Sequence, residues 1–275
     1  GNVGNLLQHW VFCEILAACR KHAEHVTFVD AYSMAPLANE RPTMDGTAHL
    51  FDFVRGRLPG VRTPYEQAWL KLASPRSAYP NSASFLTAVW RGRYSLLLCE
   101  SESATVQELR RWVEDRVERS PKCVHANVAD GDWRNRFRDG LPAWGDLTFL
   151  SFDPYMFDRN GPGRNPKPGN MYPSDLELLA AAVEPIQSPV IVQLSTYSAN
   201  NDNPQSAVVK VVHSRLEHSG LQEVAKVRAD GNMMSLVLAR NIDGVESIRS
   251  LSARFESWLG QVRDKLSGRP SGVAQ

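Results

Sequence analysis

Short apolar runs alternate with longer amphipathic segments along most of this chain. Continuous apolar runs bounded by turn residues are typical of buried strands, whereas apolar positions three or four residues apart are typical of helices with one buried face. The predicted strands cover residues 26–30, 94–100, 124–127, 147–152, 190–194, 222–227 and 233–238. The predicted helices cover residues 6–19, 104–119, 175–183, 206–218 and 246–266. This alternation predicts a right-handed, mostly parallel, doubly wound α/β sheet of the Rossmann-like class.

Two segments depart from this alternation. Residues 31–80 contain many Pro and Gly residues, two helix-like pieces at 48–57 and 64–72, and no clear strand. We expect them to form a small helical insertion over the carboxyl ends of the strands. Near the other end of the chain, a short Ala-Asp-Gly-Asn turn separates the last two strands and predicts an antiparallel hairpin. The chain is therefore predicted to form a single domain over residues 1–270, followed by a tail at 271–275.

The apolar run at residues 147–152 stops abruptly at an acid, Asp153, followed by Pro154 and Tyr155. The proline ends the strand because it has no N–H to donate and its ring fixes φ. Ligands of open α/β sheets bind beyond the carboxyl ends of such strands. Asp153 beside Tyr155 and Phe157 offers an acceptor next to flat apolar faces, which suits a planar, N–H-bearing ligand such as a nucleobase. Asp-Pro is also common turn chemistry, so a purely structural role stays open.

Two other predicted strands also end in an acid, Asp30 and Glu100. We expect Asp30, Glu100 and Asp153 to lie along one edge of a single parallel sheet. Glu100 can accept the ribose hydroxyls of a nucleotide, as acids do at that position in dinucleotide-binding folds. It can equally cap the helix that begins near Ser103.

Composition and charge narrow the classes of function. The chain has 275 residues, of which 43% are hydrophobic and 22% charged, and its formal net charge is +1, so a nucleic-acid surface must be a local patch. Its four cysteines form no C-x-x-C pair, which favours reduced thiols and argues against a zinc site. No apolar run reaches the ~18 residues of a membrane span, and no signal-peptide pattern opens the chain. We therefore expect a cytoplasmic protein that binds neither metal nor membrane, and a monomer by default.

The loop from Asp158 to Pro173 directly follows the proposed site. It carries Arg159, Arg164 and Lys167 and no acid beyond Asp158. Loops of this length in a compact domain are usually functional or disordered. We expect these three cations to contact the phosphates of a nucleic acid.

Six short motifs occur in an order and spacing that resemble one family. They are Gly1-Asn2 with Gln8-His9, Phe28-Val29-Asp30-Ala31, Tyr79-Pro80-Asn81-Ser82, Leu98-Cys99-Glu100-Ser101, Ala129-Asp130-Gly131-Asp132 and Phe152-Asp153-Pro154-Tyr155. They resemble the motifs of the RlmJ-type adenine-N6 methyltransferases of large-subunit ribosomal RNA. The resemblance covers about residues 1–160 by motif and the remainder by element order.

This resemblance implies a Rossmann-like methyltransferase sheet, S-adenosylmethionine as the cofactor and adenine N6 of ribosomal RNA as the target. It implies that the cofactor is bound by Gln8, His9, Asp30, Tyr32, Ser82, Glu100, Asp130 and Gly131. It implies catalytic roles for Asp153, Pro154 and Tyr155. By these roles, Asp153 and the Pro154 carbonyl accept the two N–H bonds of the target amine, and Tyr155 or Phe157 stacks on the base. Without the resemblance, His9 on an amphipathic helix is more typical of a boundary histidine that contacts no ligand.

Two departures from the family's pattern leave alternatives open. The turn Ala31–Pro36 has no glycine, although glycines let a backbone approach a cofactor closely. The second Pro of the family's D-P-P-Y is absent. The chain is therefore an active, divergent methyltransferase, a relative that has lost catalysis and binds nucleic acid or another partner, or another Rossmann-like enzyme such as a nucleotide-dependent oxidoreductase. The third is least favoured because no G-x-G-x-x-G follows the first strand.

Overall fold

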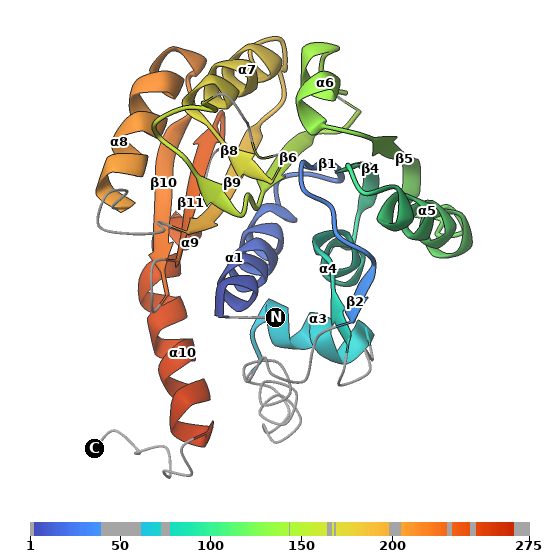
Figure 1. Cartoon of the computed structure of the whole chain (residues 1–275). Helices are drawn as coiled ribbons and strands as arrows, with labels where there is room; N and C mark the ends of the chain where they lie inside the picture. Colours follow the sequence, from blue (N-terminus) through green and yellow to red (C-terminus); the bar gives the residue numbers. More distant parts are fainter. Residues whose placement is uncertain are drawn as a thin grey trace.

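A computed structural model describes residues 3–39, 62–72, 78–142, 144–163, 167, 169–197, 205–229, 233–242 and 246–266. The described elements surround a seven-stranded sheet with strand order β10-β11-β9-β6-β1-β4-β5 (Figure 1). Its strands are β1 (His25–Asp30), β4 (Arg93–Glu100), β5 (Cys123–Asp130), β6 (Leu147–Phe152), β9 (Val190–Tyr197), β10 (Gln222–Arg228) and β11 (Met233–Arg240). Each of the seven contains a strand predicted from the sequence.

The strand directions follow the prediction as well. β1 is parallel to β4 and β6, β4 is parallel to β5, and β6 is parallel to β9. β11 is antiparallel to both β9 and β10, so the closing hairpin is confirmed. The chain starts the sheet at β1, adds β4 and β5 on one side, and then crosses to β6 on the other. In doubly wound folds this reversal of strand order marks the ligand crevice.

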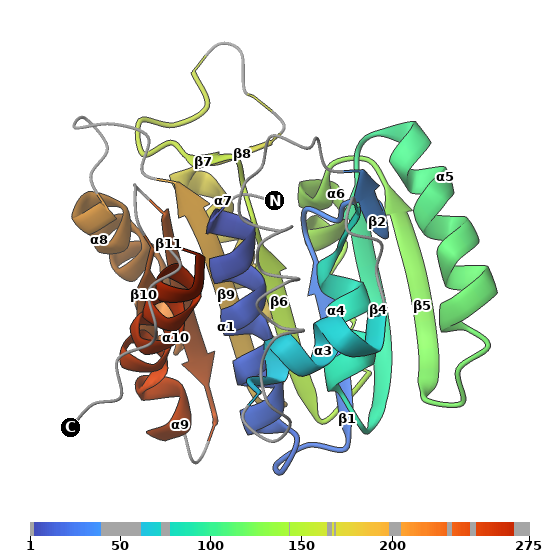
Figure 2. The same ribbon diagram turned by 90° about the horizontal axis from the view of Figure 1, so that it is seen from below.

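Helices cover both faces of the sheet, which gives three layers (Figure 2). One face is covered by α1 (Val3–Cys19), α4 (Ser82–Val89), α5 (Ser103–Trp112) and α10 (Leu251–Leu266). The other face is covered by α6 (Trp133–Arg138), α7 (Pro173–Val183) and α8 (Gln205–Leu216). Three short helical segments complete these layers: a π-helix at Val113–Val117, a 3-10 helix at Glu217–Ser219 and α9 at Glu246–Arg249.

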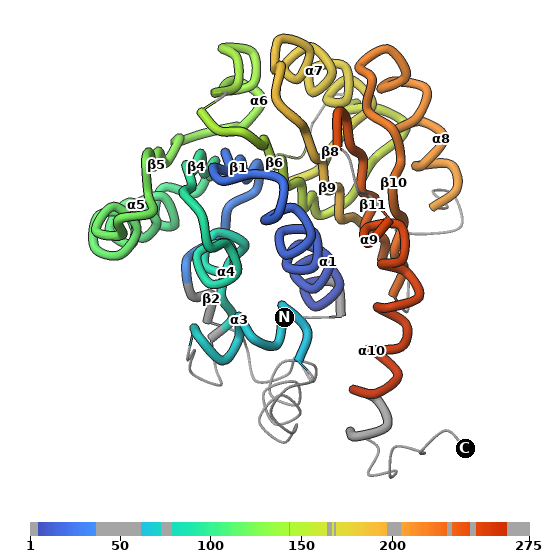
Figure 3. Tube along the Cα trace, turned by 180° about the vertical axis from the view of Figure 1, so that it is seen from behind, coloured from blue at the N-terminus to red at the C-terminus, as the bar shows by residue number. Residues whose placement is uncertain are grey.

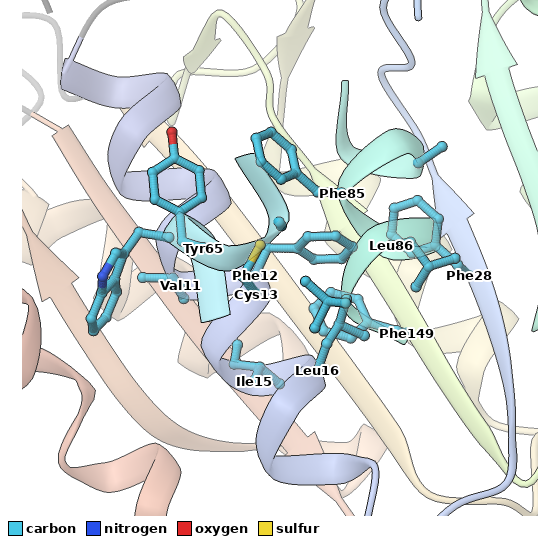
Figure 4. Close-up of a cluster of buried hydrophobic side chains, with 14 of the residues drawn as sticks. Val11, Phe12, Cys13, Ile15, Leu16, Phe28, Tyr65, Phe85, Leu86 and Phe149 are labelled. Atoms are coloured by element: carbon cyan, nitrogen blue, oxygen red, sulfur yellow. The ribbon is translucent and has the colours of Figure 1, made fainter. Parts of the chain in front are cut away.

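An aromatic cluster fixes α1 above the centre of the sheet (Figure 4). The ring of Phe12 on α1 lies 5.1 Å from that of Phe28 on β1 and 5.0 Å from that of Phe149 on β6, measured between centroids. All three side chains are fully buried. Burial of each such ring is worth about 1.5–3 kcal/mol, and the edge-to-face contacts add to it. The cluster therefore holds the middle of α1 against the middle of β1 and β6.

Helix α10 lies beside α1 and β10 (Figure 3). Arg254 of α10 donates to the carboxylate of Glu14, whose side chain is almost fully buried. Burial raises the pKa of Glu14 to about 7, although the Arg254 charge opposes this shift. The C-terminal helix is thereby joined to the first helix of the chain by a partly buried ion pair.

The insertion at 31–80 is only partly as predicted. Helix α3 (Pro64–Leu72) matches one expected helix, whereas the helix expected at 48–57 lies outside the described residues. The expectation of no strand was wrong, because β2 (Leu37–Asn39) and β3 (Ala78–Pro80) pair as a separate antiparallel ribbon. Strands of three residues are too short for a periodic pattern to show. No described residue of the insertion joins the central sheet, as expected.

Four more short elements were missed in the sequence. Helices α4 and α6 have eight and six residues, below the length at which helical periodicity stands out. In the loop after β6, the strands β7 (Met156–Phe157) and β8 (Asn170–Met171) pair in parallel. This loop therefore has a defined structure at both of its ends. The tail predicted at 271–275 lies outside the described residues.

Candidate functional site

Three acids end neighbouring strands on one edge of the sheet. Asp30, the last residue of β1, pairs with Leu98 of β4 on one side and with Ser151 of β6 on the other. Glu100 lies two residues after Leu98, and Asp153 two residues after Ser151. The predicted alignment of Asp30, Glu100 and Asp153 along one edge of a parallel sheet is therefore confirmed.

A cleft of about 720 Å³ opens beyond these strand ends. Its size lies within the range of ligand sites, about 300–1,000 Å³. Of the predicted site residues, it is lined by Tyr32, Glu100, Gly131, Asp153, Pro154 and Tyr155. Asp132, Trp133 and Met34 also line it and were not predicted. The residues predicted to act in catalysis thus share one cleft with several of those predicted to bind the cofactor.

A narrow recess of about 10 Å³ adjoins the cleft and shares Tyr32, Met34 and Asp153 with it. The remaining predicted residues that line this recess are Gln8, His9, Asp30 and Ser82. Three of them come from α1 and α4 rather than from strand ends. The fold therefore brings residues near both ends of the 31–80 insertion and the start of the chain to Asp153.

Two carboxyl groups face this recess. Asp30 is 2% exposed, and its Oδ1 accepts the Tyr32 N–H at 3.3 Å. Burial raises the pKa of Asp30 to about 7, and the Glu100 charge adds to the shift. Burial, reinforced by the Asp30 charge, also raises the pKa of Asp153 to about 7. Because like charges disfavour each other, ionisation of both carboxyl groups at once is disfavoured.

His9 is a hydrogen-bonded core histidine. Its Nδ1 lies 2.9 Å from the Tyr79 hydroxyl and its Nε2 3.0 Å from Ser82 Oγ. Its ring also stacks on Phe85 at 4.8 Å between centroids. Burial lowers the pKa of His9 to about 3, so the ring is neutral. Both ring nitrogens are thus engaged within the protein, and the predicted contact of His9 with a cofactor stays a prediction.

Glu100 has the predicted capping role and also lines the cleft, while its predicted contact with a ribose stays a prediction. Its Oε1 accepts the N–H groups of Ser101 at 2.6 Å and Glu102 at 2.8 Å, which caps the approach to α5. Its side chain also lines the cleft, and burial raises its pKa. Both of these backbone hydrogen bonds engage Oε1. Capping through this one oxygen holds the carboxyl group in place at the edge of the cleft.

The Ala-Asp-Gly-Asp sequence at the end of β5 brings only one of its two predicted cofactor residues to the cleft. Asp130 is exposed and does not line the cleft, whereas Gly131 lines it with φ +105° and donates its N–H to the Glu100 carbonyl at 2.8 Å. Glycine suits this left-handed conformation because it has no Cβ. Asp132 accepts the Arg134 N–H at 2.9 Å and so caps α6. An acid before a helix start is the signal that could have revealed Asp132.

The glycine-free turn continues the hydrogen bonding of the sheet. The Ala31 N–H donates to the Ser151 carbonyl at 3.0 Å, and the Ser33 N–H donates to the Cys99 carbonyl at 2.9 Å. These amides are therefore not available to a ligand. The side chains of Tyr32 and Met34 line the cleft instead.

The loop after β6 presents one exposed aromatic ring. Tyr155 is 75% exposed and its N–H donates to the Gly169 carbonyl at 2.8 Å. Phe157 is fully buried, so the alternative that Phe157 stacks on a base was wrong. Phe157 belongs to β7 and packs in the hydrophobic core, whereas Tyr155 lies just before this strand. Arg159 and Lys167 are exposed on the same loop, and Arg164 lies outside the described residues.

An arginine absent from the predicted site fixes the end of this loop. Arg134 donates Nε and Nη2 to the two carboxylate oxygens of Asp175 at 2.6 and 2.7 Å. Its Nη2 also donates to the Asn170 carbonyl at 2.7 Å, which accepts the Tyr32 hydroxyl at 3.3 Å as well. This Arg134 clamp, formed with Asp175 and Asn170, joins the turn after β1, helix α6 and the loop after β6.

The described residues contain no group of three or more His, Cys, Asp or Glu side chains placed to hold a metal ion. The four cysteines are free thiols. Across the described helices, none combines the length and apolar character that crossing a membrane requires.

Comparison with known proteins identifies the fold. Neither a family model nor a curated protein sequence matches this chain. Protein LPL1258 from Legionella pneumophila, described with the family model DUF519, is 13% identical with a TM-score of 0.54, over 97% of this chain and 92% of that one. This likeness shows a shared fold.

Two further solved structures are less similar. The mitomycin 7-O-methyltransferase MmcR is 13% identical over 85% of this chain and 53% of its own, with a TM-score of 0.38. Fibrillarin from Aeropyrum pernix, with S-adenosyl-L-methionine bound, is 14% identical over 57% of this chain and 60% of its own, with a TM-score of 0.36. These scores are too low to carry an argument about this chain.

Proposed function

We propose that this protein transfers a methyl group from S-adenosylmethionine to the N6 amine of an adenine in RNA, with ribosomal RNA as the expected substrate. The observation that carries the proposal is the position of Asp153. It follows the strand next to the point where strand order reverses, lines a ligand-sized cleft, and lies beside the exposed ring of Tyr155. An acceptor next to an exposed aromatic ring suits an unpaired nucleobase.

The residues of the cleft fit the proposed cofactor. S-adenosylmethionine carries a sulfonium and an ammonium group, and the carboxyl groups of Asp30 and Glu100 face the recess and the cleft. Glu100 would accept the ribose hydroxyls through its second carboxylate oxygen, Oε2. Because the amides of Ala31 and Ser33 bond within the sheet, side chains rather than turn amides would hold the methionine end. When bound, this cofactor supplies the electrophilic methyl group.

Asp153 and Pro154 would prepare the amine. The lone pair of an adenine N6 amine is delocalised into the ring, which makes the nitrogen a poor nucleophile. The Asp153 carboxylate and the Pro154 carbonyl would accept its two N–H bonds and align it with the methyl group. Positioning and electrostatic alignment supply most of the acceleration in such transfers. The proton that the nitrogen loses after transfer would pass to Asp153.

The substrate side of the cleft is formed by the loop after β6. Tyr155 would stack on the target base, an interaction worth ~1–3 kcal/mol per base. Arg159 and Lys167, both exposed on this loop, would contact phosphates.

Substitution of Asp153 tests the proposal. We expect Asp153→Ala to reduce transfer of labelled methyl groups to unstructured ribosomal-RNA fragments by about 100-fold or more, because one preorganised acceptor is lost. Cofactor affinity, measured by calorimetry, should change little. The matched control is Asp139→Ala, which removes an exposed carboxyl group after α6.

Two results would contradict the proposal. One is full methyl transfer by folded Asp153→Ala. The other is wild-type protein that binds the cofactor yet methylates neither RNA nor DNA.

One observation favours a second candidate, a relative that has lost catalysis and binds nucleic acid through the same cleft. Tyr32 extends into the cleft where the family's pattern has a glycine-rich turn. If wild-type protein binds neither S-adenosylmethionine nor S-adenosylhomocysteine but retains RNA affinity, this second function is the correct one.

A further inference from the structure

The glycine-free turn, Ala31–Pro36, is held by one buried side chain that lies outside it, that of Asn81. Asn81 is 4% exposed and precedes α4. Its Nδ2 donates to the Met34 carbonyl at 2.9 Å, and its backbone N–H donates to the Pro36 carbonyl at 3.3 Å. Asn81 therefore binds the outer half of the Ala31–Pro36 turn at two points.

The same side chain also caps α4. Its Oδ1 accepts the Ser84 N–H at 2.9 Å, and Ser84 Oγ donates to the Pro36 carbonyl at 3.4 Å. The two ends of the carboxamide thus have separate roles: the oxygen caps α4, and the nitrogen holds the turn.

The inner half of the turn is anchored by the sheet. Ser33 donates its N–H to Cys99 and its Oγ to the Asp30 carbonyl at 3.4 Å. Between these anchors, Met34 lines both the cleft and the recess and is 45% exposed. Its position therefore depends on the contact from Asn81.

We propose that Asn81 is a positioning residue for the cofactor, because its carboxamide nitrogen fixes the turn that forms one wall of the cleft and recess. Side-chain anchoring here replaces the close backbone approach that glycines provide elsewhere. The inference rests on the proposed function, since it assigns the methionine end of S-adenosylmethionine to this wall.

Asn81→Asp separates the two tasks of the side chain. Aspartate retains an oxygen that can cap α4, and a negative charge favours a helix N-terminus. It lacks the N–H donor and places a carboxylate against the Met34 carbonyl. Because this carboxylate is buried, we expect a folded protein of lower thermal stability, faster amide hydrogen exchange over residues 31–36 but not over 84–89, and roughly tenfold weaker binding of S-adenosylhomocysteine.

Two comparisons complete the experiment. Asn127→Asp makes the same chemical change at an exposed position of β5 and should leave all three measurements unchanged. Asn81→Ala removes both tasks and should lower thermal stability as well as affinity.

The outcomes separate this inference from the function on which it rests. Wild-type protein that fails to bind S-adenosylhomocysteine and S-adenosylmethionine would overturn the proposed function and, with it, any role of Asn81 in cofactor binding. Wild-type binding together with unchanged affinity in folded Asn81→Asp would overturn only the role of Asn81. Unchanged hydrogen exchange over residues 31–36 would also overturn it, because the turn would then not depend on the carboxamide.

Discussion

Asp30 and Asp153 bring two carboxyl groups to one recess, and burial raises the pKa of each to about 7. A carboxyl group whose pKa is raised on folding stabilises the protein in its protonated form. That stability is present below the unfolded-state pKa of about 4 and is lost as pH rises through the folded-state value. The pair therefore makes the protein less stable at pH 8 than at pH 5.

Replacement of Asp30 should restore much of the stability that the protein loses as pH rises. An asparagine side chain at this position would be nearly isosteric and would retain an oxygen for the Tyr32 N–H, so Asp30→Asn should raise the free energy of unfolding at pH 8 by roughly 1–3 kcal/mol. The gain should disappear near pH 4. Urea denaturation at several pH values measures it, with Asp139→Asn as an exposed control. Equal stabilisation at pH 4 and pH 8 would show that ionisation is not the cause.

We also expect Asp30→Asn to change the pH dependence of methyl transfer. Asp153 accepts the target amine only when ionised, so activity should rise as pH passes the pKa of Asp153. Because the Asp30 charge contributes to raising that pKa, Asp30→Asn should move the acidic limb of the pH profile to lower pH. Single-turnover rates from pH 5 to 9 provide the measurement. An unmoved limb would mean that the two carboxyl groups are not coupled in catalysis.

Sequence pattern could place the acids but not their surroundings. Asp30, Glu100 and Asp153 follow long apolar runs, whose strand character is unambiguous. The shared recess, the two hydrogen bonds of His9 and the exposure of Asp130 depend on contacts between residues far apart in the chain. The sequence likewise does not show which of the two aromatic rings beside the turn, Tyr155 or Phe157, is exposed.

At the scale of elements, the Arg134 clamp fixes the loop after β6. The side chains of Arg134 and Asp175 are 12% and 6% exposed. Removal of one partner from such a buried pair typically costs ~3–5 kcal/mol because the other charge stays buried. Arg134→Met should therefore lower the free energy of unfolding by about that amount and free the loop that contains Arg159 and Lys167.

Limited trypsin digestion reports on the loop without any need for activity. Cleavage after Arg159 should be faster in Arg134→Met, under conditions where the protein stays folded, than in Arg138→Met. Arg138 is exposed and donates to Asn135 within its own helix, so its loss is a matched control. Equal cleavage rates in the two variants would show that the clamp does not order the loop.

Whether a helix or strand could be predicted from the sequence depended on its length. Strands and helices with long apolar patterns were predicted correctly, and so was the closing hairpin, because its turn sequence is distinctive. The ribbon of β2 and β3, the strand pair β7 and β8, and the short helices α4 and α6 were missed. These elements are stabilised by tertiary contacts, such as those of Asn81 and Arg134, which leave no periodic signal in the sequence.

At the scale of the whole molecule, a net charge of +1 gives RNA no general attraction. Attraction must then come from a local patch, and the loop after β6 is the proposed one. The double charge reversal Arg159→Glu and Lys167→Glu should weaken RNA binding and lower the slope of log affinity against log salt by roughly 1 for each lost phosphate contact.

Fluorescence titration at several salt concentrations measures this slope. The control is the double reversal Lys210→Glu and Arg228→Glu at two exposed positions on α8 and β10, which changes the net charge equally. An equal loss of affinity in both proteins would indicate a general charge effect and not a binding loop.

The two long-range contacts of the Asn170 carbonyl affect the order in which this protein folds. It accepts from Tyr32, which is 138 positions away, and from Arg134, which is 36 positions away. Loop-closure entropy grows with the length of chain between contacting residues, and non-local contacts slow folding. The segments that carry Tyr32, Arg134 and Asn170, from β1 to β8, must therefore be in place before this junction can close. A ribosome would have to release most of the chain before the cleft could form, so the nascent protein would bind no ligand there until synthesis had passed Asn170.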